Sequence, residues 1–360
     1  MKPRSLVILH FNTFEYYPPV LNFINDLISD KPYYFVSIFS TSNETVFQKK
    51  DYESVSVCRF GILSNKSFIR YLSYFLFNLF STIILLINRP TTIIVYETLS
   101  VFPAFFYSRI FKKVNIHIHY HEYTSLSEQI NASYYMKILY KCEYLLLRNF
   151  TCSHTNEDRK LLFLIDNPKL SSVNVEVYPN LPPSHWWFKF GKFKNLFNYD
   201  KIKLVYVGAL DFETMYLKEI LDFVKANPDA LELTLFCHNL TDKIKDKIIG
   251  YSAPNVFLKK PIVYDKLPQE LVKYDIGLVL YKGHIPNYVY NVPNKVYEYL
   301  SCGLHVIVDK SLITTINLGI EQIGVVDYKK LDTRFLKLLL LNIPKKEPEY
   351  SRMPKLVNKL

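Results

Sequence analysis

The stretch Asn291–Val308, NVPNKVYEYLSCGLHVIV, contains a predicted helix that runs directly into a predicted strand. Pro293 suits the first turn of a helix, because its missing N–H group is not needed there, and Gly303 suits the position just past the helix end. The apolar run Leu304–Val308 follows at once and is typical of a buried strand. A helix that leads straight into a buried strand indicates a parallel α/β sheet.

Two charged side chains share one face of this helix near its N-terminus. Lys295 and Glu298 are three residues apart and are therefore neighbours on the helix surface. Free backbone N–H groups and the positive end of the helix dipole favour a phosphate here, and a lysine adds a point charge. A carboxylate one turn further on can accept hydrogen bonds from a ribose diol. The face thus suits a nucleoside diphosphate, although by spacing alone an ordinary exposed Lys–Glu pair is the commoner interpretation.

Outward from this segment, strand-like runs alternate with helical stretches along the whole chain. The predicted strands are Ser5–His10, Tyr33–Phe39, Val55–Phe60, Thr92–Tyr96, Asn115–Tyr120, Val175–Tyr178, Lys203–Val207, Leu231–Phe236, Val256–Leu258, Ile276–Leu280 and Leu304–Val308. The main predicted helices between and after them are Pro19–Ser29, Ser67–Ile87, Val101–Phe111, Tyr134–Arg148, Asn156–Leu164, Glu213–Lys225 and Arg334–Leu341. This alternation predicts parallel sheets covered by helices on both faces.

The length of 360 residues exceeds the usual range of one domain. Turn residues follow Asn180, and the stretch Gly191–Asp200 has no clear periodicity, so we predict a linker over residues 181–200. We expect α/β domains at residues 1–180 and 201–330, each a Rossmann-like doubly wound sheet, that face a cleft. Residues 331–360 are expected to form a helix and a basic tail that pack back on the first domain. Ligands of such sheets bind at the carboxyl ends of the strands.

The helix-strand segment resembles the donor-binding helix of GT-B-fold glycosyltransferases, particularly glycosyltransferase family 4 and its relatives. Their pattern runs Pro-x-Lys-x-x-Glu-Tyr-x-x-x-Gly-x-x-Val-Ile. This chain supplies Pro293, Lys295, Glu298, Tyr299, Gly303, Val306 and Ile307 at those positions. The resemblance implies that Lys295 contacts the donor phosphates and Glu298 the ribose, that residues 1–180 form the acceptor side, and that the anomeric configuration is retained.

Other donor-side positions match the family less closely. Gly208 ends the run Leu204–Gly208, which is similar to the strand and glycine that open the family's C-terminal domain and let backbone amides approach the phosphates. The glutamate that many members carry eight residues before the ribose-binding one is Tyr290 here, with Asn291 beside it. The usual Arg and Lys after the first strand are also missing. Lys218 is the first base in that region, and Lys282 is a candidate substitute for the absent charge.

Candidate catalytic residues follow predicted strands of the first half. Ile118–Glu122 looks like the family's strand-end His-Glu motif, which implies that His121 faces the cleft near the transferred sugar, with His119 as the rival. Glu97 ends a strand that points at the cleft, and Glu122 follows His121, so both are candidate acceptor-side bases, as is Glu15. The residues alone do not choose among the three carboxylates.

The net charge of +11 favours an anionic partner, which can be a nucleic acid, an anionic lipid or a phosphorylated ligand. No zinc-finger or RNP-like motif is present, which argues against nucleic acid, so we expect a phosphorylated ligand or an anionic membrane surface. The segment Tyr71–Asn88 contains no charge, is flanked by Arg70 and Arg89, and approaches the length of a membrane span. It fits a buried helix between two strands, a surface attachment or a true span.

The remaining features complete the predicted function. Five cysteines lie far apart without CxxC spacing, and the first apolar run is too short for a signal peptide, so we expect a cytoplasmic protein, peripheral on the inner face of the plasma membrane. No Asp-x-Asp motif occurs, so no metal or cofactor is expected. We predict a hexosyltransferase that moves a sugar from a nucleotide-diphosphate sugar to a glycan or lipid-linked oligosaccharide of a bacterial surface polysaccharide, lipopolysaccharide or capsule. A nucleotide-sugar epimerase of the same fold and a non-catalytic binding protein are the alternatives.

Overall fold

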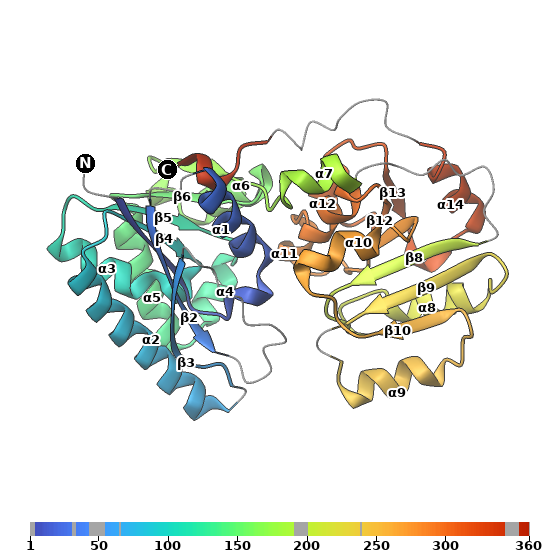
Figure 1. Cartoon of the computed structure of the whole chain (residues 1–360), viewed down its shortest axis with the longest axis horizontal. Helices are drawn as coiled ribbons and strands as arrows, with labels where there is room; N and C mark the ends of the chain where they lie inside the picture. The colour runs from blue at the N-terminus through green and yellow to red at the C-terminus, as the bar shows by residue number, and fades with distance from the viewer. Residues whose placement is uncertain are drawn as a thin grey trace. The chain divides into compact units, whose positions relative to one another are not determined.

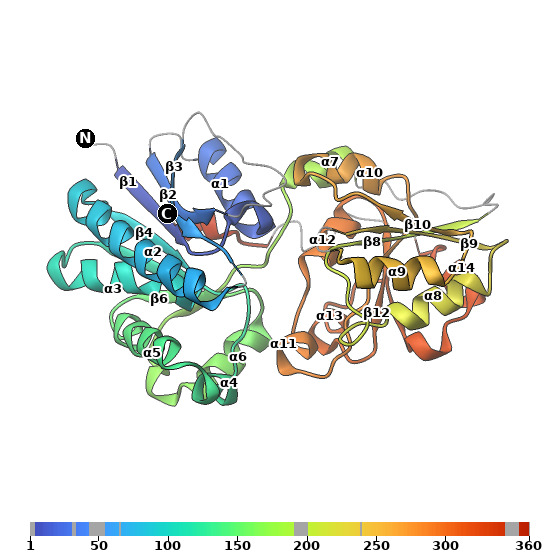
Figure 2. The same ribbon diagram turned by 90° about the horizontal axis from the view of Figure 1, so that it is seen from below.

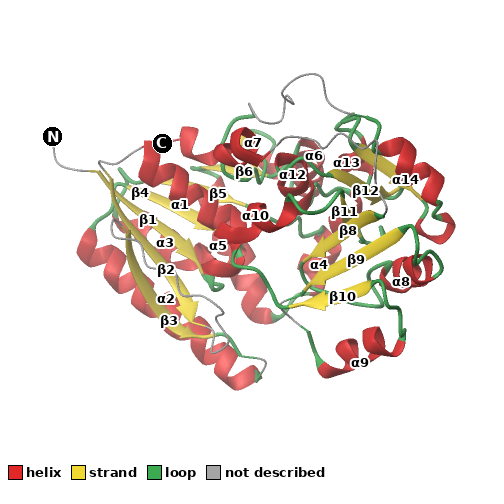
Figure 3. Cartoon of the chain, turned by 45° about the vertical axis from the view of Figure 1, so that its right-hand side comes forward, coloured by secondary structure: helices red, strands yellow, loops and turns green. Residues whose placement is uncertain are grey.

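The structure is a computed structural model that describes residues 4–30, 34–42, 55–64, 66–190, 201–237, 240–342 and 353–359. The chain divides into two compact units. The first comprises Met1–Asn180 together with Pro354–Leu360, and the second comprises Leu181–Met353. In both units helices alternate with strands along the chain, as Figure 3 shows by colour.

The first unit is built on a seven-stranded sheet in the order β3-β2-β1-β4-β5-β6-β7, in which every neighbouring pair is parallel. Its strands are β1 (Arg4–His10), β2 (Tyr34–Ser42), β3 (Val55–Ile62), β4 (Thr92–Tyr96), β5 (Asn115–His119), β6 (Thr151–His154) and β7 (Val175–Val177). The strand order reverses between β1 and β4, which makes the sheet doubly wound and marks the point where ligands of such sheets bind.

Helices cover both faces of this sheet (Figures 1 and 2), with α1 on one side and α2, α3 and α5 on the other. The α-helices are α1 (Pro18–Asp30), α2 (Ser67–Asn88), α3 (Val101–Ile110), α4 (Leu126–Asn131), α5 (Tyr134–Leu147) and α6 (Glu157–Asp166). Short 3₁₀ turns are η1 (Phe14–Tyr16), η2 (Thr98–Ser100), η3 (Pro168–Leu170) and η7 (Leu356–Lys359). Successive residues of β1 face opposite sides, so Val7 and Leu9 enter the core beneath α2, α3 and α5.

The second unit repeats the plan with a six-stranded parallel sheet in the order β10-β9-β8-β11-β12-β13. Its strands are β8 (Ile202–Val207), β9 (Leu231–Phe236), β10 (Val256–Lys259), β11 (Ile276–Val279), β12 (His305–Asp309) and β13 (Ile323–Val326). Its helices are α7 (Ser184–Phe190), α8 (Leu217–Lys225), α9 (Asp242–Gly250), η4 (Tyr264–Lys266), α10 (Leu267–Leu271), α11 (Pro286–Val289), α12 (Asn294–Ser301), α13 (Ile313–Ile316), η5 (Tyr328–Lys330) and α14 (Thr333–Leu339). The strand order reverses here between β8 and β11.

The two-sheet fold class predicted from the sequence is confirmed, with local corrections. The strands β6 and β13 and the helices α4, α9, α10, α11 and α13 were not predicted. Residues 184–190 of the expected linker form α7, whose Trp186 is buried in the second unit's core, while 191–200 lie outside the described residues. The helix expected to pack on the first domain, α14, instead buries Leu336 and Leu339 in the second unit. Within the first unit, Lys355 of the C-terminal segment forms an ion pair of 2.9 Å with Asp26 on α1.

The uncharged segment Tyr71–Asn88 lies in α2, between β3 and β4. This helix is long and apolar enough to cross a membrane by length and composition, and 22% of its most apolar window is buried inside the protein. Only one face of the helix therefore fits the buried-helix interpretation. Its other face exposes large apolar residues, among them Phe68, Phe75 and Ile87.

Candidate nucleotide-sugar site

The segment that carries the predicted donor site is anchored where the strand order of the second sheet reverses. The described pairing between β8 and β11 ends at Val205 and Gly277. Beyond it, the Val207 backbone N–H donates a hydrogen bond of 3.0 Å to the hydroxyl of Tyr299 on α12. A Cβ atom on Gly277 would lie 2.1 Å from the Tyr299 ring, so only glycine leaves room for it. The tyrosine thus fastens α12 to the carboxyl ends of β8 and β11.

Lys295 lies one turn before Tyr299 and is only 8% exposed. Its Nζ atom lies 4.1 Å from the ring centroid of Tyr206, near the end of β8, and 5.0 Å from that of Tyr281, just after β11. Within the part of the chain that the structure describes, this ammonium forms no ion pair or hydrogen bond with a protein group. Burial lowers the pKa of Lys295 to about 7, and the charge of Glu298 partly offsets this. Such a lysine is well suited to an anionic ligand, which would supply the direct ion pair that no described protein group makes.

Gly208, the residue after β8, lies directly beside this ammonium. Its φ of +141° is in a region that favours glycine, and a Cβ atom there would lie 3.1 Å from the Nζ of Lys295. The structure therefore brings together Gly208 and Lys295, as the sequence predicts for two groups that contact the same phosphates.

Glu298 is also buried, with 6% of its surface exposed. Burial raises its pKa to about 7, while Lys295 and a hydrogen bond from Tyr264 act in the opposite direction. The low exposure of both Lys295 and Glu298 shows that the exposed-pair interpretation is wrong. A buried carboxylate gains from further hydrogen-bond donors, which is the property expected of a group that binds a ribose diol.

Two other predicted donor-site lysines are engaged elsewhere. Lys218 lies on α8, where it is 66% exposed at its side chain and pairs with Asp222 at 2.7 Å. The Nζ atom of Lys282 donates to the backbone oxygen of Glu213 at 3.1 Å and stands 5.7 Å from the ring centroid of Tyr216. Lys282 thus holds the segment after β8 against the segment after β11, which is a positioning role for the two loops that flank Lys295.

Tyr290 and Asn291 lie between α11 and α12, and both are half-buried. The backbone oxygen of Asn291 accepts a hydrogen bond of 2.7 Å from the hydroxyl of Thr315, which fixes the approach to α12. Sequence reasoning missed Tyr206 and Tyr281, the two rings that hold Lys295. The signal available was a tyrosine near the end of each central strand, but in a buried strand such a residue is ordinarily part of the core.

In the first unit, the three predicted catalytic residues meet at the ends of β4 and β5. One carboxylate oxygen of Glu97 accepts the backbone N–H of His121 at 2.5 Å and that of Glu122 at 3.2 Å. Burial raises the pKa of Glu97 to about 8, with a further contribution from the Glu122 charge. Glu97 also has a φ of +62°, which is strained for a residue other than glycine. Strain of this kind marks a candidate functional position, and Glu122 beside it is exposed.

His121 lies within an aromatic and histidine cluster at this same point. Its ring stacks on Tyr96 with centroids 4.9 Å apart, and the rings of His119 and His10 follow at 5.1 and 6.3 Å. Burial lowers the pKa of His121 well below its ordinary value, and its histidine neighbours add to the effect. The imidazole is thus neutral near pH 7. The rival, His119, is committed to a hydrogen bond of 2.8 Å with Ser153.

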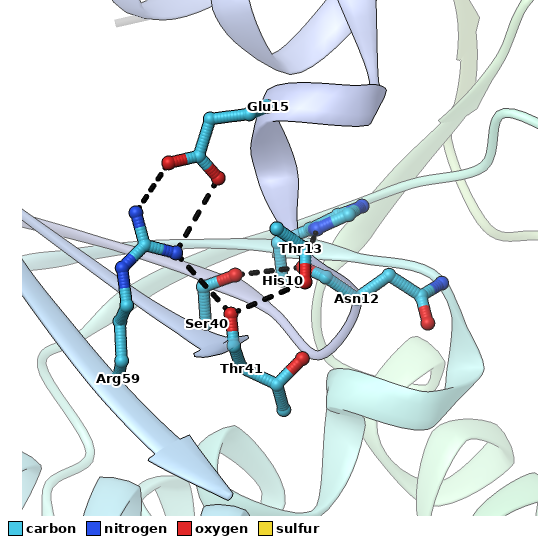
Figure 4. A network of polar contacts seen from close by, with 7 residues as sticks. All are labelled: His10, Asn12, Thr13, Glu15, Ser40, Thr41 and Arg59. Atoms are coloured by element: carbon cyan, nitrogen blue, oxygen red, sulfur yellow. Dashed lines mark hydrogen bonds and ion pairs between the residues drawn. The ribbon is translucent and has the colours of Figure 1, made fainter. Parts of the chain in front are cut away.

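The loop after β1 is held by the polar network shown in Figure 4. The guanidinium of Arg59 binds both carboxylate oxygens of Glu15 and donates to the backbone oxygen of Thr41 at 3.2 Å. Ser40 donates to the backbone oxygen of Asn12 at 2.7 Å. Glu15, a candidate base in the sequence, is therefore engaged in fixing this loop. Sequence reasoning missed Arg59, which carries no motif signal.

Comparisons with known proteins agree at the level of the fold. No protein-family model matches the chain, and no curated protein matches it by sequence. Among solved structures, sucrose-phosphate synthase from Thermosynechococcus elongatus superposes with a TM-score of 0.66 at 13% identity, covering 94% of this chain and 89% of that one. A structure titled trehalose-6-phosphate from E. coli bound with UDP-2-fluoro glucose gives 0.62 at 14% identity, with 93% and 90% covered.

A third neighbour is the lipopolysaccharide outer core galactosyltransferase WaaB, at a TM-score of 0.54 and 13% identity, with 85% of this chain and 80% of that one covered. The chain has the GT-B fold. The expected GT-B architecture is thus confirmed, whereas the resemblance to glycosyltransferase family 4 stays a prediction.

Proposed function

We propose that this protein is a glycosyltransferase that takes a sugar from a nucleotide-diphosphate sugar bound to the second unit. The observation that carries the proposal is the buried Lys295, which forms no direct ion pair or hydrogen bond with a described protein group and lies against Gly208 at the point where the strand order reverses. Glu298 lies one turn further on the same helix. The GT-B fold supports this function, and one neighbour of that fold was solved with UDP-2-fluoro glucose.

The chemistry requires stabilisation of a leaving phosphate. Breaking the bond between the anomeric carbon and the diphosphate oxygen leaves negative charge on that oxygen. The Lys295 ammonium and the free N–H groups at the start of α12, which has no side-chain cap, are the groups that oppose this charge. We propose that they act without a metal ion. Activity that is unchanged by a chelator supports this, and activity restored by one divalent ion after chelation contradicts it.

We place the acceptor on the first unit, where Glu97, His121 and Glu122 meet. Glu97 and Glu122 are the candidate acceptor-side bases, and the neutral His121 ring is the candidate contact for the transferred sugar. We further propose a hexosyl transfer with retention to a glycan or lipid-linked oligosaccharide of a bacterial surface polysaccharide, in the cytoplasm. The galactosyltransferase neighbour acts on a lipopolysaccharide outer core by its title, which supports this class of acceptor. Proton NMR of the first-formed product distinguishes retention from inversion.

Donor binding is tested by a thermal-shift screen with UDP, GDP, CMP, dTDP and ADP. A nucleotide at a hundred times its dissociation constant stabilises the folded state by about 2.7 kcal/mol. We expect one nucleotide to stabilise the wild type and the Lys218→Ala control, and to have no effect on Lys295→Ala or Glu298→Ala. If the nucleotide stabilised both variants as much as the wild type, the nucleotide site would lie elsewhere. Sugar products measured with and without acceptor then separate transfer from epimerisation, and no turnover at all would favour a binding protein.

A further inference from the structure

Helix α2 exposes its apolar residues and buries its polar ones. Its five buried residues are Ser73, Phe77, Asn78, Ser81 and Leu85, of which three are polar. Its exposed large apolar residues are Phe68, Tyr71, Leu72, Phe75, Leu79, Phe80, Ile83 and Ile87. An amphipathic helix on a protein in water has the opposite arrangement, because burial of apolar surface is what holds it in place.

The exposed residues form one continuous stripe. Members recur every three or four positions over the 22-residue helix, which places them on one face, and we call this set the outer stripe: Phe68, Leu72, Phe75, Leu79, Ile83 and Ile87. Helix α9 of the second unit provides the contrast, since its exposed residues include Asp242, Lys243, Lys245 and Asp246. A soluble monomer rarely leaves a long apolar face in water, so the outer stripe indicates a binding surface.

The charges around the outer stripe select its partner. Between residues 54 and 121 the chain has seven basic residues and a single acidic one, Glu97. The exposed basic residues lie at both ends of α2 and at the end of its neighbour α3: Lys66, Arg70, Arg89, Arg109, Lys112 and Lys113. An apolar face rimmed by cations matches the acyl boundary and the phosphates of an anionic bilayer. A second copy of the chain would instead bring a like-charged rim against this one.

We propose that the outer stripe docks on the surface of an anionic membrane, with α2 lying in the plane of the interface. The buried face keeps the helix on the protein. The Ser73 hydroxyl donates to the backbone oxygen of Ile62 in β3 at 2.7 Å, and Asn78 donates to the Tyr135 hydroxyl of α5 at 2.7 Å. Because these contacts fasten α2 to the sheet and to the next helices (Figure 2), the helix lies on the bilayer and does not span it. The docking surface does not depend on the transfer chemistry proposed above.

The test is co-sedimentation with vesicles of phosphatidylcholine containing 0% or about 30% phosphatidylglycerol. The outer-stripe variant combines Phe75→Ser, Leu79→Ser and Ile83→Ser. The matched control replaces three apolar residues of similar or greater exposure on other helices, with 57%, 63% and 60% exposed: Leu161→Ser, Ile165→Ser and Ile249→Ser. A rim variant combines Lys112→Gln and Lys113→Gln.

The wild type and the control are expected to bind the anionic vesicles, and the outer-stripe variant to bind them at least about tenfold more weakly. The rim variant should lose binding to anionic vesicles by about tenfold or more. Equal binding of the outer-stripe variant and the wild type would overturn the proposal. A wild type that does not bind the vesicles would also overturn it. A wild-type dimer that the outer-stripe substitutions disrupt would overturn it too, and would assign the surface to a second copy of the chain.

A second measurement keeps the proposal testable if the triple variant fails to fold. Bilayers of brominated lipid should quench the added fluorescence of Phe75→Trp, after subtraction of the two native tryptophans, and leave that of Ile249→Trp unchanged. Equal quenching of the two variants would contradict insertion of the outer stripe.

Discussion

The buried lysine predicts that nucleotide binding takes up a proton. With a pKa of about 7, about 90% of Lys295 is uncharged at pH 8. A bound diphosphate favours the charged form, so binding at pH 8 recruits about 0.9 proton to this side chain. Glu298, with a pKa of about 7, is already about 90% ionised at pH 8 and releases about 0.1 proton on binding a ribose. The expected net uptake is about 0.8 proton per nucleotide.

Calorimetric titration of one nucleotide at pH 8, in two buffers with different ionisation enthalpies, measures this uptake directly. Lys295→Arg keeps a charge that is present at every working pH, so its uptake should fall to about zero while binding persists. Glu298→Gln should keep an uptake of about 0.9, because removing a carboxylate does not make the lysine easier to protonate. Lys218→Ala, on exposed α8, should match the wild type.

The same titration can refute the reasoning. An equal uptake by the wild type and Lys295→Arg would mean that another group takes up the proton. No uptake by the wild type at pH 8 would mean that Lys295 is already charged in the free protein, or that it does not contact the phosphates. Either result would refute the link between the buried Lys295 and proton uptake on nucleotide binding.

Three further predictions concern stability. Gly277→Ala should lower the free energy of unfolding by about 1–3 kcal/mol, because its Cβ meets the Tyr299 ring; an unchanged denaturant midpoint would contradict the anchoring role. Arg59→Met should destabilise the fold by about 3–5 kcal/mol, because it removes the guanidinium that binds the Glu15 carboxylate, whose side chain is 6% exposed, and adding Glu15→Leu should restore part of the loss. Glu97→Gln should raise Tm more at pH 8.5 than at pH 5. The Glu97 carboxyl has a pKa of about 8 in the folded protein and 4.5 in the unfolded chain, so the folded protein loses stability as pH rises between these values, and glutamine avoids this loss. Equal shifts of Tm at both pH values would refute this.

The sequence predicted the fold through periodicity, and it failed where periodicity is absent. Strands such as Thr92–Tyr96 are uninterrupted apolar runs that only a sheet covered on both faces buries. The strand Thr151–His154 was missed because it is short and its residues are polar or small. Its burial depends on partners far along the chain, such as the two histidines of β5 that bond Ser153. Such a strand is specified by tertiary contacts that a local pattern does not contain.

In the candidate donor site, too, one part could be predicted from the sequence and another depends on tertiary packing. Lys295 and Glu298 were predicted because a helix fixes the spacing of two side chains on its surface. Whether they are buried depends on α12 being drawn onto the sheet by Tyr299 and on the small residue at Gly277 that admits the ring. Lys218 and Asp222, four residues apart and so also neighbours on one helix face, form an exposed ion pair. The spacing of charges therefore indicates a shared face, and the packing of the helix decides whether that face is a site.

For helix α2, too, the sequence could not show which side faces the protein, and here the fold leaves the apolar side exposed. Its lack of charge suited a buried helix, because composition reports how apolar a segment is and not which side faces the protein. The decisive feature is the arc occupied by Ser73, Asn78 and Ser81, which the fold turns inward, where Ser73 and the Asn78 amide donate hydrogen bonds to neighbouring elements. Once those polar residues are inside, the apolar ones have no protein left to cover them. The free energy to be gained by removing that face from water is available only to a partner, and the cations around it make an anionic bilayer the best match.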